Sequence, residues 1–142
     1  MKYWLEEKAK KKGGIVAPTP GDAGYDIRAY QDFIVPGKHR VIMPTGIHLA
    51  VPRGFVGIIK DRSSLASVGI FIHGGVIDSR FRGEIGIIFE NVLSSDYIFV
   101  AGERIAQLIV VGVYTSGIEN VENLSELGIT NRTSGFGSTG KM

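Results

Sequence analysis

Short apolar runs separated by glycine and proline constrain the fold of this chain more than any other feature of its sequence. Glycine makes up 20 of the 142 residues, about double the average share of roughly 7%. The apolar runs are rich in isoleucine and valine, which suits strands joined by tight turns better than helices. The sequence therefore predicts an all-β fold, and its length predicts one domain, 1–142, with a core of its own.

The composition excludes several kinds of site and partner. The chain has no cysteine, so disulfides, thiolate zinc sites and a cysteine nucleophile are excluded. It has no long apolar span and no signal-peptide pattern, so we expect a soluble, intracellular, cytoplasmic protein without a membrane partner. The formal net charge is only +2, and the basic residues are scattered rather than aligned. We therefore expect small anionic ligands and no stable binding of nucleic acid.

The two ends of the chain have compositions unlike its middle. Residues 1–14 form a charged N-terminal segment, for which we expect a short helix or a loose, solvated arm. Residues 131–142 form a glycine-rich C-terminal arm. Its glycines imitate G-x-G-x-x-G and most of a phosphate-binding loop, but both motifs need a preceding strand and a following helix. We expect instead an arm whose amides suit a phosphate chain and whose single ring, Phe136, covers a flat group.

Alternating apolar and polar residues predict strands along the middle of the chain. The first covers 22–29 and carries Asp26, a candidate carboxylate for chemistry. Further strands are expected between 33 and 52, interrupted by a break at Pro44. Three histidines occur in the chain, but their spacing is not that of metal ligands.

Two later strands place polar residues where a ligand could use them. The apolar strand 55–59 ends in 60–66, where a cation and two hydroxyls could hold an anion, although an ordinary polar loop explains them equally well. The strand 104–111 is almost continuously apolar, so we expect burial on both of its faces. Polar groups on a buried strand need partners, which makes Gln107 a candidate ligand contact.

A lone carboxylate, Asp78, stands in what we interpret as a tight apolar hairpin. Glycines precede and follow it within Gly74–Gly83, apolar residues lead into it, and the apolar strand 85–89 leaves it. An acid in such a place either caps its own turn or takes part in chemistry, and the turn-capping role is common for short polar side chains. The hairpin alone leaves both interpretations open.

Five strings in a fixed order resemble those of the trimeric dUTP nucleotidohydrolases (dUTPases). They are AGYDIRA, DRSSLAS, GGVIDSRFRGEIG, ERIAQLI and RTSGFGSTG, and the likeness covers about residues 17–142. The resemblance implies a distorted jelly-roll subunit of the β-clip type, in a homotrimer with an exchanged C-terminal arm. It also implies Mg²⁺-assisted hydrolysis of dUTP to dUMP and pyrophosphate, which keeps uracil out of DNA and supplies dUMP for thymidylate synthesis.

The resemblance also implies a role for each matching residue. Asp26 would hold Mg²⁺ through water, and Asp78 would activate the water that attacks the α-phosphorus. Main-chain groups near Val76 and Gly86 would read uracil, while Phe81 would pack on the deoxyribose. The full set of implied substrate-binding residues is Arg62, Ser63, Ser64, Val76, Ile77, Phe81, Gly86, Gln107, Arg132, Phe136, Gly137 and Ser138.

The chain departs from the family pattern in three places. Phe81 replaces the usual tyrosine, Ser64 replaces a glycine, and Arg80 stands where an acid is common. The string RSSLA is also typical of dCTP deaminases, whose glutamate three residues before the strand-ending asparagine is replaced here by Ile88. A deaminase is therefore the first alternative function, and a non-catalytic nucleotide-binding regulator with the same fold is the second.

Overall fold

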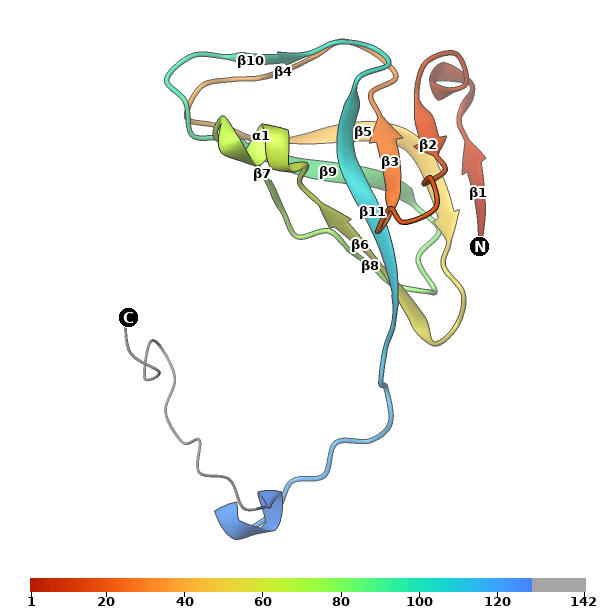
Figure 1. Cartoon of the computed structure of the whole chain (residues 1–142), viewed down its shortest axis with the longest axis vertical. Helices are drawn as coiled ribbons and strands as arrows, with labels where there is room; N and C mark the ends of the chain where they lie inside the picture. The colour runs from red at the N-terminus through yellow and green to blue at the C-terminus, as the bar shows by residue number, and fades with distance from the viewer. Residues whose placement is uncertain (129–142) are drawn as a thin grey trace.

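Strands make up almost all of the regular structure in the computed structural model, which describes residues 1–128 (Figure 1). The elements in chain order are β1 (Lys2–Leu5), η1 (Glu7–Ala9), β2 (Gly14–Val16), β3 (Tyr25–Arg28), β4 (Phe33–Val35), β5 (Arg40–Ala50), β6 (Phe55–Lys60), α1 (Ser63–Ser67), β7 (Ile70–His73), β8 (Val76–Ile77), β9 (Glu84–Asn91), β10 (Tyr97–Phe99), β11 (Arg104–Gly112) and η2 (Leu124–Leu127). The predicted all-β class is confirmed.

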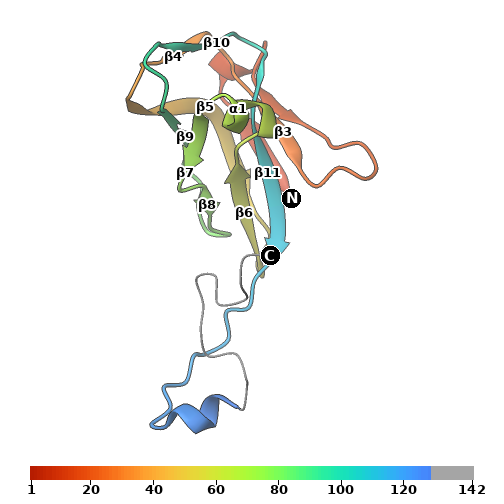
Figure 2. The ribbon, with the colours of Figure 1, turned by 60° about the vertical axis from the view of Figure 1, so that its left-hand side comes forward.

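The strands form two larger sheets and one small one, and every strand pair is antiparallel. The four-stranded sheet has the order β1-β5-β9-β7, and the five-stranded sheet has the order β2-β3-β11-β6-β8. Figure 2 shows these two sheets as two layers, with the β10-β4 pair across one end. Two antiparallel layers around one core are the arrangement expected of a jelly roll.

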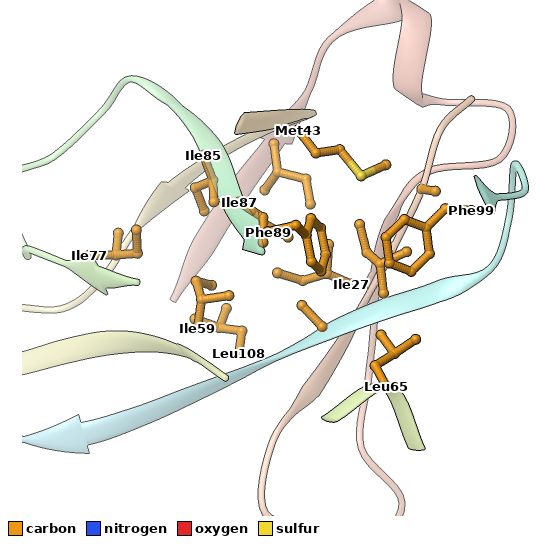
Figure 3. Close-up of a cluster of buried hydrophobic side chains, with 14 of the residues drawn as sticks. Ile27, Met43, Ile59, Leu65, Ile77, Ile85, Ile87, Phe89, Phe99 and Leu108 are labelled. Atoms are coloured by element: carbon orange, nitrogen blue, oxygen red, sulfur yellow. The ribbon is translucent and has the colours of Figure 1, made fainter. Parts of the chain in front are cut away.

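The core fills the space between the two larger sheets. Ile27 and Leu108 point into it from the five-stranded sheet, and Met43 and Phe89 from the four-stranded one (Figure 3). The rings of Phe89 and Phe99 lie with their centroids 4.8 Å apart. Close packing of branched and aromatic side chains holds the two layers together and fixes the strand ends that carry the polar residues described below.

The N-terminal segment differs from the helix or loose arm that we expected. Residues 2–5 form β1, which pairs with β5 from Lys2 opposite Ala50 to Leu5 opposite Ile47. The following 3-10 turn, η1, buries the side chain of Ala9 completely. The charged composition suggested a solvated segment, but hydrogen bonds to the edge of a sheet and one small buried residue are enough to dock it.

The break expected at Pro44 is a bulge inside one continuous strand, β5. Pro44 lies opposite Gly86 and His48 opposite Glu84, so β5 carries extra residues between these pairs. The bulge tolerates a proline that could not donate to a regular ladder. The polar junction at 60–66, in contrast, ends in a short helix, α1, rather than a loop.

The chain leaves the two sheets after β11. Both views show the segment leading to η2 running away from the sheets, and Ile118 in this segment is 98% exposed. Within residues 1–128, no helix combines the length and the apolar character that crossing a membrane requires.

Candidate active site

Asp26, Gln107 and Lys60 lie in one row across three neighbouring strands. Asp26 on β3 is opposite Gln107 on β11, which is opposite Lys60 on β6. A polar cavity of about 370 Å³ opens beside this row and is lined by Asp26, Gln107, Arg62 and Arg104 together with residues 21–24. Gln107 makes no side-chain hydrogen bond with any residue from 1 to 128, so its amide can serve a ligand.

Asp26 is held by two arginines. The Arg104 guanidinium donates to Oδ2 of Asp26 at 3.1 Å, and Nε of Arg62 lies 3.8 Å from Oδ1. Arg62 also donates to the carbonyl of Arg104 at 2.9 Å. Asp22 also lines the cavity, so two carboxylates match two guanidinium groups in number. Each guanidinium carries five N–H donors, and those not used on Asp26 or on the carbonyl of Arg104 can bind an anionic ligand.

Sequence reasoning missed Arg104 as a residue of this cavity. Strict alternation places residues 104 and 107 on opposite faces of a strand. The pairing of β11 with β3 shifts between Arg104 and Ala106, so that Ile105 is the extra residue of a bulge. The bulge turns Arg104 to the side of Gln107, and only the pairing of the strands reveals it.

The expected burial of β11 on both faces is wrong for its second half. Ile105 and Leu108 are fully buried, but Val111 is 37% exposed. Ser63 and Ser64, in the first turn of α1, are exposed next to Arg62.

The interpretation of Asp78 as part of a tight β8–β9 hairpin is wrong. β8 pairs with β6 in the five-stranded sheet, while β9 pairs with β5 and β7 in the other sheet. Residues 78–83 therefore form a turn that crosses from one layer to the other, and we call this segment the crossing turn. The hairpin that does form joins β7 to β9, with His73 opposite Ile88. After β7 the chain passes to β6 of the other sheet, where the carbonyl of Gly75 accepts from the amide of Ile59 at 2.7 Å and β8 begins.

Hydrogen bonds within the crossing turn fix its shape. The amide of Phe81 donates to the carbonyl of Asp78 at 3.0 Å, and the Arg82 side chain donates to the carbonyls of Ser79 and Phe81 at 2.8 and 2.5 Å. The Phe81 ring lies so close to Gly83 that an added Cβ would be 2.7 Å from it. A larger residue at this position would displace the Phe81 ring, which is 40% exposed. The turn presents the Asp78 carboxylate to solvent.

A second cavity, of about 640 Å³, lies along the crossing turn and is lined by Asp78 and Phe81 with Val76, Phe55 and other residues of 55–56, 79–80, 113 and 115. Val76 is 66% exposed, whereas Ile77 is nearly buried. Gly86 lies on β9, outside this lining. The predicted residues Arg132, Phe136, Gly137 and Ser138 lie outside the described residues.

Asp26, on β3, and Asp78, directly after β8, line different cavities. β3 and β8 are separated by β11 and β6, which places them about 14 Å apart across the sheet. Ile77 is opposite Gly57, three residues along β6 from the row of Asp26, which adds about 10 Å along the strands. One chain therefore keeps its two candidate carboxylates more than about 15 Å apart.

The residues around Asp26 suit a magnesium ion that arrives with a phosphate ligand. Within residues 1–128, no three His, Asp or Glu side chains gather closely enough to hold a metal ion on their own. Mg²⁺, however, usually keeps several waters and binds one or two carboxylates together with substrate phosphates. The cavity offers the carboxylates of Asp26 and Asp22 for the ion and the guanidinium groups of Arg62 and Arg104 for the phosphates, which fits that mode of binding.

The chain is similar to known proteins over most of its length. A family model described as dUTPase matches residues 13–140. The chain belongs to the dUTPase family. It is 44% identical over 123 residues to the deoxyuridine 5'-triphosphate nucleotidohydrolase of Paramecium bursaria Chlorella virus 1, which covers 86% of both chains. It is 39% identical over 140 residues to the Arabidopsis thaliana enzyme of the same name, covering 96% of this chain and 80% of that one.

Solved dUTPase structures share the fold. The dUTPase of Staphylococcus bacteriophage 80alpha with dUPNHPP is 25% identical, has a TM-score of 0.87, and covers 99% of this chain and 98% of that one. Native EIAV dUTPase is 28% identical, with a TM-score of 0.74 over 86% of this chain and 96% of that one. The jelly-roll fold predicted for this dUTPase is confirmed.

Proposed function

We propose that this dUTPase hydrolyses dUTP to dUMP and pyrophosphate, with Asp78 as the general base. The proposal rests on one observation: a dUTPase-family chain presents an exposed carboxylate on a hydrogen-bonded turn and, separately, a cavity around Asp26 to which two arginines contribute. A triphosphate repels an attacking nucleophile, so hydrolysis needs cations around the phosphates and a base beside the water. The Asp26 cavity supplies the cations, and the cavity along the crossing turn supplies the base.

In the proposed reaction, a water oxygen attacks the α-phosphorus and passes a proton to the carboxylate of Asp78. The bond from the α-phosphorus to its bridging oxygen breaks, and pyrophosphate leaves. Arg62, Gln107 and the exposed hydroxyls of Ser63 and Ser64 would hold the phosphates. Mg²⁺, reached by Asp26 through water, would neutralise the charge that develops on the phosphate oxygens.

Recognition of the nucleoside would use the crossing turn and the β7–β9 hairpin. The Phe81 ring is 40% exposed in the larger cavity and can pack on deoxyribose. Main-chain groups of Val76 on β8 and Gly86 on β9, which belong to different sheets, would read the uracil edge. Arg132, Phe136, Gly137 and Ser138, outside the described residues, would complete the site from the C-terminal arm.

We infer that the site is shared between chains. The attacking water and the metal ion must both come within a few ångströms of one phosphoryl group, yet one chain separates Asp78 from Asp26 by more than about 15 Å. A second copy that brings its Asp26 cavity to the crossing turn removes this conflict. A closed homotrimer with head-to-tail interfaces places three such sites equivalently, and the segment after β11 leaves the sheets as an exchanged arm would.

Pyrophosphate release from dUTP, dCTP, dTTP and UTP tests the proposal, with Mg²⁺ present and then chelated. We expect release from dUTP alone, and its loss on chelation. The deaminase alternative predicts ammonia from dCTP, but Glu90, the acid nearest to the required position, is bound by Arg40 and His73 on the outer face of β9. Tight binding of dUTP without release of pyrophosphate would indicate the non-catalytic nucleotide-binding regulator instead.

A further inference from the structure

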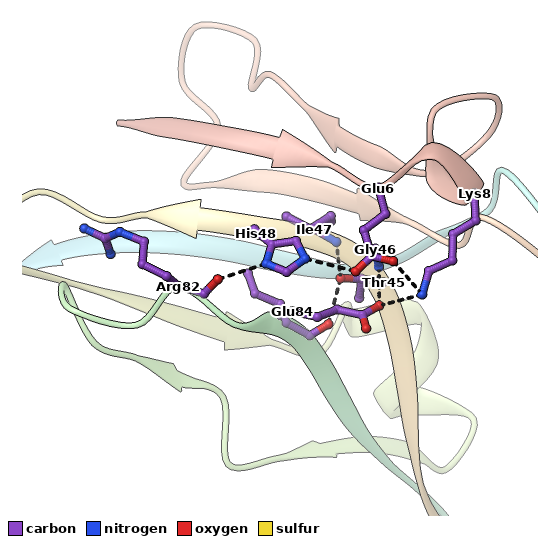
Figure 4. A network of polar contacts seen from close by, with 9 residues as sticks. Glu6, Lys8, Thr45, Gly46, Ile47, His48, Arg82 and Glu84 are labelled. Carbon is purple, nitrogen blue, oxygen red and sulfur yellow. Dashed lines mark hydrogen bonds and ion pairs between the residues drawn. The ribbon is translucent and has the colours of Figure 1, made fainter.

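A network of polar contacts joins the N-terminal segment to the crossing turn, with His48 at its centre (Figure 4). His48 is on β5, directly after the bulge, and its Nδ1 lies 2.9 Å from the carbonyl oxygen of Arg82. Its Nε2 lies 3.0 Å from the carboxylate of Glu6. The ring therefore touches the end of the crossing turn on one side and the N-terminal segment on the other.

Both of these contacts require a donor from the ring. A carbonyl oxygen and a carboxylate can only accept, and a neutral imidazole carries one N–H, so only the imidazolium makes both bonds at once. The geometry thus selects the protonated ring. When His48 loses a proton, one of the two bonds must break.

The bond to Arg82 continues into the residues that carry the chemistry. The Arg82 side chain holds the carbonyls of Ser79 and Phe81, and the amide of Phe81 donates to the carbonyl of Asp78. The path from His48 to Asp78 therefore runs through hydrogen bonds and one short stretch of backbone. A shift of the Arg82 carbonyl would therefore be transmitted through these bonds to the backbone of Asp78.

We propose that His48 is a positioning residue for Asp78, and that Glu6 of the N-terminal segment sets its charge. Protonated His48 holds the crossing turn in the form that catalyses dUTP hydrolysis, and Glu6 keeps it protonated at higher pH. The family match begins at residue 13, so this device uses a part of the chain outside the matched region. The inference rests on the proposed function, because it needs Asp78 to be the base.

The charges around His48 favour its protonated form. Glu6 lies on one side, Glu84 is opposite it on β9, and the Trp4 ring lies 5.1 Å away, centroid to centroid. The cations that face the ring are Lys2, Lys8 and Arg82, and Lys8 is neutralised by Glu6 at 2.7 Å and Glu84 at 3.4 Å. The Arg82 carbonyl, and after it the Glu6 carboxylate, raise the pKa of His48 above its usual 6.5.

Steady-state kinetics of His48→Gln and Glu6→Gln with dUTP test the proposal, together with Lys10→Gln as a matched control. Lys10 belongs to the same segment but bonds only Glu7, within residues 1–128. For His48→Gln we expect kcat to fall about tenfold with KM nearly unchanged, as for a misplaced catalytic group. Wild-type kcat should decline as pH rises through the raised pKa of His48, and this step should be absent in His48→Gln.

Glu6→Gln keeps the histidine and separates the proposal from a loss of folding. We expect its alkaline step to move to lower pH, while Lys10→Gln behaves as wild type. The imidazole titration of His48, followed by NMR in wild type and Glu6→Gln, needs no turnover and should show the same downward move. A His48→Gln enzyme with wild-type kcat and pH profile, or a His48 pKa unchanged by Glu6→Gln, would overturn the proposal.

Discussion

The backbone and the side chain of Asp78 have separate roles. The crossing turn uses its backbone carbonyl, which accepts from Phe81, and its carboxylate makes no hydrogen bond with any of residues 1–128. We expect Asp78→Asn to retain dUTP binding while kcat falls by about 10²- to 10⁴-fold, the usual contribution of a general base. Single-turnover kinetics and a binding titration measure the two effects separately.

A carboxylate of purely structural role provides the control for this variant. Asp32 accepts from the amide of Ala101 at 2.8 Å, and asparagine can make the same bond. Asp32→Asn should therefore keep wild-type turnover. Near-normal turnover of Asp78→Asn would remove the assignment of the base.

Glu90 links acid stability to a single residue. It bonds His73 on β7 at 2.5 Å and Arg40 on β5 at 3.0 Å, and these bonds, that of His73 first, lower the pKa of Glu90. A carboxyl whose pKa is lower in the folded state stabilises the protein above its unfolded pKa, near 4.5, and loses this effect as pH falls through the folded pKa. We expect the free energy of unfolding of Glu90→Gln to fall less steeply with decreasing pH than that of wild type.

Urea unfolding between about pH 3 and pH 6 measures this loss through the free energy of unfolding. Glu122→Gln, in the exposed segment after β11, is the matched control and should follow wild type. Parallel pH curves for wild type and Glu90→Gln would contradict the assignment.

Docking of η1 against β5 depends on Gly46, at the bulge of β5. Its φ is +67°, and an added Cβ would lie 2.6 Å from the Cβ of Ala9 in η1. Gly54 has a similar φ of +82° with nothing within 4 Å of the added Cβ. Gly54→Ala should therefore cost only the backbone term of about 1 kcal/mol.

Gly46→Ala has the same backbone cost in unfolding free energy and also forces η1 away from β5. We expect a loss of unfolding free energy larger than that of Gly54→Ala by about 1 kcal/mol or more. Amide exchange in β1 should accelerate in Gly46→Ala alone, because β1 and η1 dock together. Equal losses in the two variants would show that the contact with Ala9 does not hold the segment.

At the scale of the whole molecule, a shared site predicts complementation between inactive variants. Asp26→Asn and Asp78→Asn should each lose turnover when pure. After unfolding and refolding as a mixture, sites that combine Asp26 of one chain with Asp78 of another become intact. Random assembly in a closed oligomer makes about a quarter of the sites intact, so pyrophosphate release should recover to about that share of wild type.

Mixing the folded variants without exchange of chains gives the baseline for this measurement. No recovery after verified refolding and mixed assembly would place both carboxylates of a site in one chain. That outcome would contradict the separation of more than about 15 Å estimated from the strand spacing of the five-stranded sheet.

The sequence by itself determined the class of fold, most strand positions and the family. The alternation along β3, the apolar run of β6 and the apolar residues before Asp78 are local signals, because each depends on neighbouring residues only. The five strings place Asp26, Arg62, Asp78 and Gln107 in the order typical of dUTPases, and the family comparison confirms the family. The roles of these residues stay predictions.

Tertiary structure decided what depends on pairing between distant strands. The bulge at Ile105 brings Arg104 to Asp26, and the pairing of β8 with β6 turns an expected hairpin into a crossing turn. Docking of the N-terminal segment likewise depends on the open edge of β5. Alternation fixes which face a side chain takes only within one regular strand, whereas bulges, partners and layers follow from the balance of packing and hydrogen bonds over the whole chain.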